Sequence, residues 1–169
     1  FDAPALDLGG DLTLLVHPSP RFGGGEFANS PWLQELPDPV SKITWHSWLE
    51  MNENTAEQRG IRVGDIVTVT SPHGSVDVPV WIYPGIREDA VALAMGGGHT
   101  NFGRWADGSG VNALALLPSE SEQPSGAMVT VATTVTVTPT GERRRLATIE
   151  GSSDQHDRPI APAVTLADL

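Results

Sequence analysis

The amino-acid sequence predicts a mainly β domain that closes into a barrel. Apolar residues make up 39% of the 169 residues, which is enough for one domain with a hydrophobic core. Valine and threonine are frequent, and 18 glycines and 14 prolines divide the chain into short segments, as is typical of β-rich proteins with long connections. Strands do not alternate regularly with helices, which argues against a doubly wound parallel sheet. A closed barrel is favoured because it leaves no strand edge unpaired.

Alternating apolar residues predict six or seven strands. Residues 66–71 and 75–83 flank the turn-forming sequence Pro-His-Gly and are expected to form a hairpin. Residues 127–140 predict a long, half-buried strand with Val129, Val131, Val135 and Val137 on its inward face, and residues 141–151 are expected to pair back onto it. The remaining strands are expected at residues 11–17, 41–48 and 90–95.

Two short helices are expected between these strands. The clearer one spans residues 53–59, where Asn52 or Asn54 can cap the first turn and Gly60 can end the helix in a left-handed conformation. A single helical turn is expected in "WLQEL" (32–36), before the Pro-Asp-Pro sequence stops it. The Gly64–Asp65 pair predicts a tight turn that leads into the next strand.

The chain is expected to hold one domain between two irregular ends. Residues 1–10 predict a linker, residues 11–150 the β-barrel domain, and residues 151–169 an extended or disordered tail. The first residue is Phe1 rather than methionine and no signal peptide is recognisable, so we expect a segment of a longer protein.

Charge and composition exclude several classes of function. The formal net charge of −11 repels nucleic acid and anionic membrane surfaces, so we expect neither as a direct partner. Lys42 is the one lysine, and an anionic ligand would have to be held by backbone N–H groups and a few arginines. The absence of cysteine excludes disulfides, iron–sulfur clusters and cysteine zinc sites within this chain. No apolar run is long enough for a membrane helix.

Several motifs resemble one protein family. They are "GIRVGDIVTV", the hairpin turn "SPHG", "YPGI", the sequence "GGGH", and "GSGVNALALL". Together they resemble the molybdopterin dinucleotide-binding domain found at the C-terminal end of large molybdenum or tungsten oxidoreductases of the dimethyl sulfoxide reductase type. The resemblance implies a double-psi β-barrel (aspartate decarboxylase-like) with one or two short helices.

A narrower resemblance lies in "ANSPWLQELPDPVSKITWHSW" (28–48) and "GHTNFGRWADGSGVN" (98–112). These stretches are similar to the molybdopterin-oxidoreductase-like iron–sulfur subunit of alternative complex III, a membrane-attached respiratory complex that oxidises quinol. The two resemblances together cover roughly residues 10–118.

The resemblance implies that the intact parent protein carries a molybdopterin guanine dinucleotide with molybdenum or tungsten. In this view the domain holds the phosphate and base part of the cofactor, and none is expected to be tightly bound to the isolated segment. The alternative is a structural domain that has lost the cofactor and serves a quinol-oxidising assembly. A small recognition or enzyme domain outside the family is the third possibility. The cofactor-binding residues implied are Asn52, Gly98, His99, Thr100, Arg104 and Asn112.

Each of these side chains also has a purely structural interpretation. Asn52 can cap the helix that follows it, and Asn112 can bond a loop carbonyl instead of a pterin or guanine edge. His99 can donate to a phosphate or can fix its own glycine-rich loop. Arg104 can bind a phosphate, but we favour a weak salt bridge to Asp107.

The resemblance also implies partners and a location. We expect contacts with other domains of the same subunit and with iron–sulfur and membrane subunits of a respiratory complex. Membrane association would come through those subunits, on the periplasmic or outer face. Trp32, which lies in a proline-flanked loop, is the expected interface anchor, and the other tryptophans are expected in the core or an interface. No catalytic motif or metal-ligand spacing is present, so we expect no catalysis by this chain alone.

Overall fold

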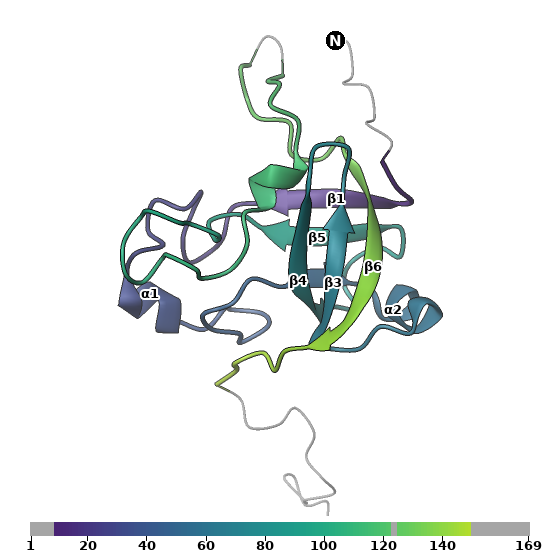
Figure 1. Ribbon diagram of the computed structural model, residues 1–169, viewed down its shortest axis with the longest axis horizontal. Coiled ribbons are helices and arrows are strands. Elements are labelled where there is room, and N and C mark those ends of the chain that lie inside the picture. Colours follow the sequence, from purple (N-terminus) through teal and green to yellow (C-terminus); the bar gives the residue numbers. More distant parts are fainter. Residues whose placement is uncertain (1–8, 123–124, 150–169) are drawn as a thin grey trace, which may run out of the picture.

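The computed structural model describes residues 9–122 and 125–149 (Figure 1). The predicted tail at residues 151–169 and most of the predicted linker at residues 1–10 lie outside the described residues, so those domain limits stay predictions. Within the described residues, no helix is both long and apolar enough to cross a membrane.

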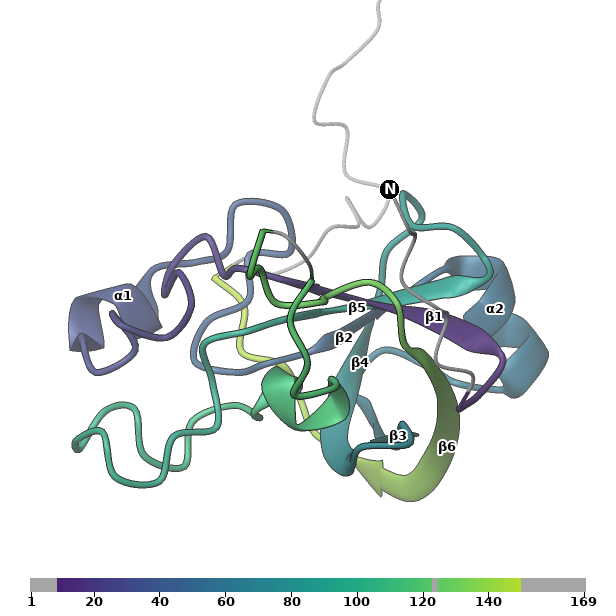
Figure 2. The same cartoon turned by 90° about the horizontal axis from the view of Figure 1, so that it is seen from above.

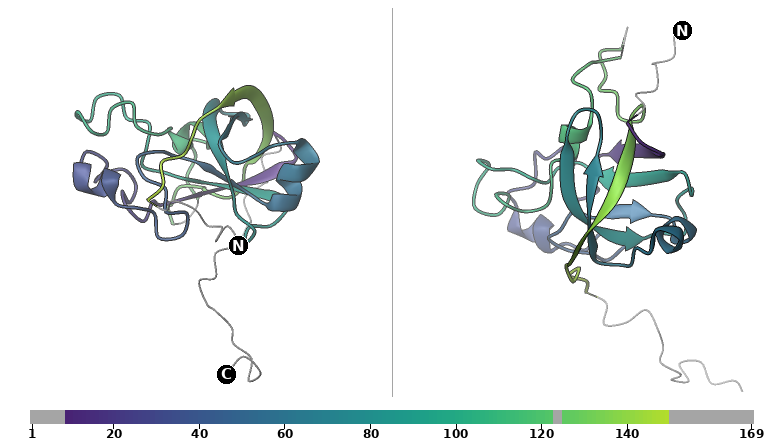
Figure 3. Two further views of the ribbon diagram at one scale, coloured as in Figure 1. Left: turned by 90° about the horizontal axis from the view of Figure 1, so that it is seen from below. Right: turned by 45° about the vertical axis from the view of Figure 1, so that its right-hand side comes forward.

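Six strands form a closed barrel in the order β1-β5-β2-β4-β3-β6. The pairs β1–β5 and β2–β4 are parallel, and the other four pairs are antiparallel. Figure 1 shows β3, β4 and β6 running across β1 and β5, and the right-hand view of Figure 3 shows the same crossing. This arrangement confirms the mainly β fold and the expected double-psi β-barrel. The strands are β1 (Leu12–His17), β2 (Leu49–Met51), β3 (Asp65–Thr70), β4 (Ser75–Ile82), β5 (Ala90–Ala94) and β6 (Thr134–Arg143).

The β3–β4 hairpin forms where the sequence predicts it. Val67 lies opposite Val78, and both side chains are fully buried. The tight turn between the strands is held by the Ser71 hydroxyl, which accepts hydrogen bonds from the N–H groups of His73 (3.1 Å) and Gly74 (3.2 Å). Alternation of apolar and polar residues therefore places one face of each strand in the barrel interior.

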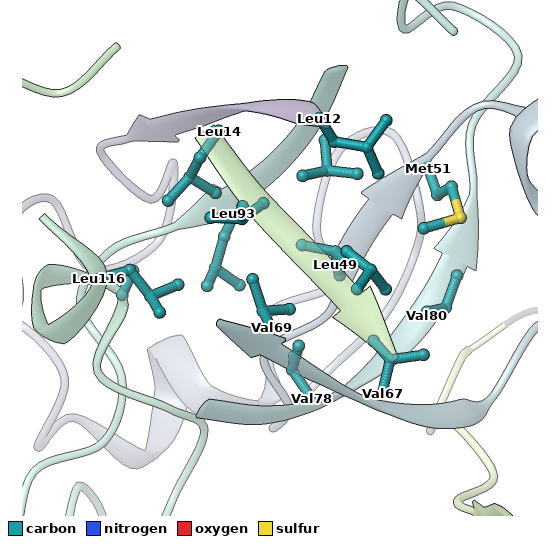
Figure 4. Close-up of a cluster of buried hydrophobic side chains, with 14 of the residues drawn as sticks. Leu12, Leu14, Leu49, Met51, Val67, Val69, Val78, Val80, Leu93 and Leu116 are labelled. Carbon is teal, nitrogen blue, oxygen red and sulfur yellow. The ribbon is translucent and has the colours of Figure 1, made fainter. Parts of the chain in front are cut away.

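Figure 4 shows the core that fills the barrel. Leu14, Leu49, Met51 and Leu93 come from three different strands and are fully buried. Leu116 closes one end from the 3₁₀ helix η1 (Ala113–Leu116) and is also fully buried. The strands are therefore held by one continuous apolar cluster, which is the main favourable contribution to folding.

Two short α-helices lie outside the barrel. Helix α2 (Glu53–Arg59) matches the prediction: the Asn52 side chain accepts from the Asn54 N–H (2.9 Å), and Gly60 ends the helix with φ +67°. Helix α1 (Pro31–Glu35) is the single expected turn, and the Leu36 N–H ends it by donating to the Trp32 carbonyl. The turn predicted at Gly64–Asp65 is also present, because the Asp65 carboxylate accepts from the Arg62 N–H (2.8 Å).

The strand predicted at residues 41–48 is wrong. Lys42 and Trp45 have positive φ angles of +61° and +64°, which no extended strand contains. Only Ile43 forms an isolated bridge, with Thr148, and the strand β2 begins later, at Leu49. The pattern of apolar residues in this segment reflects packing of a folded-back loop and not a sheet register.

The prediction of a strand at residues 127–140 places both of its ends too early in the sequence. Val131 is 55% exposed, and β6 starts only at Thr134. The strand then continues to Arg143, which lies opposite Asp65 of β3, so residues 141–143 extend the strand and do not pair back onto it. The alternation of valine and threonine starts before Thr134, where no partner strand is present among the described residues, so alternation alone does not locate the start of β6.

Candidate functional site

The glycine-rich segment at residues 96–112, here called the glycine loop, leaves the barrel at the end of β5. Strands β1 and β5 are parallel, with His17 opposite Ala94, so both strands end at the same edge. The Met95 N–H donates to the His17 carbonyl (2.8 Å) at this edge. The glycine loop and the segment that carries α1 project together from the barrel, on the side away from α2 (Figures 2 and 3).

Close packing of the chain against itself explains several of the glycines. The Gly98 N–H donates to the Ser109 carbonyl (2.8 Å), and a Cβ atom on Gly98 would lie 2.2 Å from the backbone nitrogen of Asn112. A Cβ atom on Gly97 would lie 2.8 Å from the Ser47 hydroxyl, and one on Gly110 only 2.3 Å from it. The backbone therefore approaches other parts of this chain more closely than any other residue type allows.

Gly98 lies against the Asn112 backbone, and His99 follows Gly98 in the glycine loop. The His99 ring stacks on Phe102 with 4.7 Å between ring centroids. Its Nε2 atom is buried and has no hydrogen-bond partner among the described residues. A Cβ atom on Gly25 would lie 3.0 Å from this nitrogen, so His99 also fills space against the neighbouring loop.

Asn112 has one half of its amide engaged and the other available. Its Oδ1 accepts from the Leu114 N–H (3.1 Å) and caps η1. The side chain is exposed, and its Nδ2 makes no hydrogen bond within the described residues. A buried nitrogen without a partner on His99 and an available amide on Asn112 are two groups that a polar ligand could satisfy.

Thr100 and Arg104 lie farther out on the glycine loop, beyond the bridge between His99 and Asp107. Both are exposed, and the Arg104 guanidinium lies 4.8 Å from the Trp105 ring centroid. The expected salt bridge between Arg104 and Asp107 does not form in the described part of the chain. Asp107 instead accepts from the Phe102 N–H (2.7 Å).

Asn52 lies at the opposite end of the barrel from the glycine loop. Met51 pairs with Val91 near the start of β5, whereas the glycine loop follows the end of that strand, about 13 Å farther along. The Asn52 side chain caps α2 and donates from Nδ2 to the Ile86 carbonyl (2.7 Å). The structural interpretation of Asn52 is confirmed, and the structure does not bring it near His99 or Asn112.

A buried arginine that sequence reasoning missed joins the loops that lie beside the glycine loop. Arg21 is 5% exposed and donates to the carbonyls of Gln34 (3.4 Å), Leu36 (3.3 Å) and His46 (3.4 Å). Its guanidinium also lies 4.6 Å from the Phe22 ring centroid. Burial lowers the pKa of Arg21, and the Asp38 carboxylate opposes that shift. The Pro/Gly-rich surroundings of Arg21 predict an exposed loop, so no signal in the sequence identified it.

Gln34 links α1 to the glycine loop. It is 1% exposed, its Nε2 donates to the Ala28 carbonyl (2.8 Å), and its Oε1 accepts from the Ser109 hydroxyl (3.2 Å). The same hydroxyl approaches the Trp45 carbonyl at 2.8 Å. These contacts hold three loops in one arrangement beside the end of the barrel.

Ionisable groups surround a small cavity of about 30 Å³ next to Arg21. Burial raises the pKa of Glu50, and Asp38 adds to that shift, whereas a hydrogen bond from the Trp48 indole and the charge of His17 oppose it. Burial also lowers the pKa of His46, and Arg144 and Arg21 add to that effect. The described residues contain no group of three or more potential metal ligands.

The raised pKa of Glu50 predicts a pH-dependent effect on stability. The fold favours the neutral acid, so the stability that Glu50 contributes is complete below its ordinary pKa of 4.5 and is lost as the pH rises through the raised value. Glu50→Gln should therefore stabilise the domain at neutral pH, by less than about 1 kcal/mol because the group is partly solvated. The same substitution should change the stability little at about pH 4. Urea unfolding at both pH values, with the exposed Glu57→Gln as control, measures this. Equal effects of Glu50→Gln at both pH values would contradict the assignment.

The comparisons with known proteins agree with this arrangement. The sequence model of the molydopterin dinucleotide binding domain matches residues 33–133. The chain belongs to this family. The matched range includes the glycine loop, α2 and strands β2 to β5.

Two curated relatives of the molydopterin dinucleotide binding domain are much longer than this chain. The menaquinone reductase, molybdopterin-binding-like subunit, of Nitratidesulfovibrio vulgaris is 35% identical over 82 residues, which cover 48% of this chain and 12% of the relative. The arsenate respiratory reductase molybdopterin-containing subunit ArrA of Shewanella sp. (strain ANA-3) is 32% identical over 95 residues, covering 55% of this chain and 11% of the relative. The chain therefore spans about a tenth of the length of these relatives.

A solved structure supports the fold of the domain. Acetylene hydratase from Pelobacter acetylenicus superimposes with a TM-score of 0.57 over 76% of this chain and 18% of that protein. The sequence identity is 13%, so this likeness concerns the fold alone.

Proposed function

We propose that this chain is the cofactor-binding domain at the C-terminal end of a molybdopterin oxidoreductase-like respiratory subunit. In this proposal it holds the phosphate and base part of a molybdopterin guanine dinucleotide. The observation that carries the proposal is that the glycine loop holds a buried His99 Nε2 without a hydrogen-bond partner and an Asn112 amide nitrogen that is available, in a chain of the molydopterin dinucleotide binding family. Both groups lie at the barrel edge where β1 and β5 end.

The residues at this edge fit the polar part of such a cofactor. The Asn112 amide can donate to a ring carbonyl, and the His99 nitrogen can donate or accept according to its tautomer. Thr100 offers an exposed hydroxyl and Arg104 a guanidinium suited to phosphate. Gly98 acts through packing, because its N–H is engaged by Ser109. When bound, the cofactor and its metal supply the redox chemistry, and this chain contributes binding and orientation.

The alternative is a cofactor-free structural domain in a quinol-oxidising assembly similar to alternative complex III. Three observations favour it. Gly97, Gly98 and Gly110 are packed against this chain's own atoms, so they do not form an open cradle. The net charge of −11 opposes a bound polyanion, and Arg104 is the one arginine in the glycine loop. One relative is itself named "molybdopterin-binding-like".

Both versions of the proposal place the domain inside a larger assembly. Trp32 is 80% exposed and Phe27 is 56% exposed, and both belong to the segment that packs against the glycine loop. This apolar surface supports contact with other domains of the same subunit. We further propose iron–sulfur and membrane subunits as partners, with membrane association through them on the periplasmic or outer face.

The test is the metal and pterin content of the intact parent protein, purified from its native host. We expect near-stoichiometric molybdenum or tungsten by elemental analysis and a matching amount of pterin by fluorescence after oxidative release. His99→Ala and Asn112→Ala should each lower this occupancy several-fold without unfolding the domain, because each removes a ligand contact.

Asn52→Ala is the matched control, because it removes an amide at the other end of the barrel. It should weaken the α2 cap by about 1 kcal/mol and leave the occupancy unchanged. Full occupancy in both test variants would show that His99 and Asn112 are not ligands. A parent that contains neither metal nor pterin and still oxidises quinol would establish the cofactor-free alternative.

A further inference from the structure

A groove of about 530 Å³ lies on the barrel wall, separate from the candidate cofactor site. It is bounded by the chain that follows β6, by the loop before β3, and by the segment that precedes β2. Its walls include Ile43, Val63, Trp81, Arg144, Arg145 and Leu146. In Figure 1 this region lies at the lower end of the barrel, where β6 ends.

One wall of the groove is apolar. Ile43 and Leu146 are buried in a small cluster with Trp48, and Trp81 packs against that cluster. The Trp81 ring also stacks on Tyr83, with 5.3 Å between ring centroids. Val63, which also lines the groove, is 48% exposed. The apolar groove residues that keep accessible surface among the described residues are the half-buried Trp81 and the exposed Val63.

The other wall is cationic. Three arginines follow one another at residues 143–145 in a chain whose net charge is −11. Arg143 is engaged, because it forms a salt bridge to Asp65 (2.7 Å) and donates to the Val63 carbonyl (3.0 Å). Arg144 and Arg145 are exposed, and their guanidinium groups have no carboxylate or carbonyl partner among the described residues.

The backbone holds these two walls in place. The Arg144 N–H donates to the Gly64 carbonyl (2.7 Å), and a Cβ atom on Gly64 would lie 2.6 Å from the Arg144 carbonyl oxygen. On the other side, the Thr44 N–H donates to the Ala147 carbonyl (2.8 Å). Lys42 and Trp45 hold positive φ angles on either side of this contact, a strained conformation that surrounding structure must enforce. The groove is thus formed before any partner binds, which lowers the entropic cost of binding.

We propose that this groove is the docking site for a polypeptide segment that presents carboxylates beside a large apolar side chain. The inference rests on the proposed function, because the larger subunit proposed above supplies that segment. Two free guanidinium groups suit two carboxylates, and the accessible surface of Trp81 and Val63, backed by the buried Ile43 and Leu146, suits the apolar side chain. A nucleic acid does not fit, because the −11 charge of the chain repels it. Because this chain spans about a tenth of its relatives, a parent of similar length offers ample polypeptide to occupy the groove.

The test introduces a cross-linkable amine at the cationic wall of the intact parent protein. Arg145→Lys keeps the positive charge at an exposed position, and carbodiimide then joins an amine to a carboxylate only when the two are in contact. We expect a cross-linked peptide between position 145 and an aspartate or glutamate of the same polypeptide, outside residues 1–169, identified by mass spectrometry. Thr136→Lys is the matched control, because it adds an exposed amine on β6 near the other end of the strand. It should give no such product.

Arg144→Lys offers a second position for coupling if the geometry at position 145 prevents it, and arginine modification gives an independent measurement. Phenylglyoxal modifies accessible arginines, and Arg144 and Arg145 should be protected in the intact parent but reactive in the isolated 169-residue chain. Reactive arginines in the parent, or a cross-link to a different subunit, would overturn the inference. Protection of Arg144 and Arg145 without any polypeptide cross-link from lysine at either position would point to a small anion and would also overturn it. Metal and pterin are measured in the same preparations, so loss of the cofactor and loss of the docking contact are separate outcomes.

Discussion

Gly98→Ala is expected to destabilise the domain by about 3 kcal/mol or more. The added Cβ atom would lie 2.2 Å from the Asn112 nitrogen and 2.6 Å from the Val111 carbonyl carbon. Both are backbone atoms, so no flexible side chain can move aside. The start of the glycine loop at Gly98 would have to separate from its end at residues 109–112, breaking the hydrogen bond between Gly98 and Ser109. Urea unfolding followed by circular dichroism measures the loss.

Gly108→Ala is the matched control for this prediction. Gly108 lies in the same loop with φ +72°, close to the +77° of Gly98, but a Cβ atom there would meet nothing within 4 Å. The left-handed backbone alone should cost about 1 kcal/mol in either variant. The difference between the two variants therefore isolates the close approach of the two backbone segments. Equal losses of stability would show that the segments do not pack as described.

Arg21→Ala is expected to cost about 2–4 kcal/mol. The substitution leaves the carbonyls of Gln34, Leu36 and His46 without their buried donor. It also removes the packing of the guanidinium on Phe22 and Trp48, whose ring centroids lie 4.6 Å and 5.7 Å from it. Because Arg21 joins three loops, we expect the glycine loop to become more mobile as well. Unfolding curves report the free energy, and amide hydrogen exchange in residues 96–112 reports the mobility.

Arg104→Ala serves as the comparison for Arg21. Arg104 is exposed and stacks on Trp105, so its loss should change stability by less than about 1 kcal/mol. Arg21→Met, which retains much of the packing but no donor, should fall between the two alanine variants. If Arg21→Ala costs no more than Arg104→Ala, then Arg21 does not hold the loops at Gln34, Leu36 and His46 together.

These predictions bear directly on how the domain could bind its cofactor. His99 and Asn112 are positioned by the backbone contact at Gly98, and the loops around them are positioned by Arg21 and Gln34. A ligand that needs both polar groups would therefore meet them already in place, which favours binding. The same rigidity would preserve the loop in a domain that has lost its cofactor, so only measured metal and pterin separate the two functions.

The sequence by itself determined the features that depend on near neighbours. Helix α2 was predicted with its cap at Asn52 or Asn54 and its end at Gly60, because capping involves residues within one turn, and the structure places the cap at Asn52. The β3–β4 hairpin was predicted because its turn and its alternation are adjacent along the chain. Family membership also followed from short motifs, since glycine turns at fixed spacings can be recognised in the sequence alone.

Only the tertiary structure decided the features that depend on residues far apart in the chain. The ends of β6 are set by its partners β1 and β3, which local alternation cannot reveal. The segment at residues 41–48 folds back because Ile43 meets Thr148, more than a hundred residues later. The resemblance implies both Asn52 and His99 as cofactor contacts, but closure of the barrel places them at opposite ends and brings Arg21 inside. In each case barrel closure fixes which distant segments meet, and that contact outweighs the weaker preferences of the local sequence.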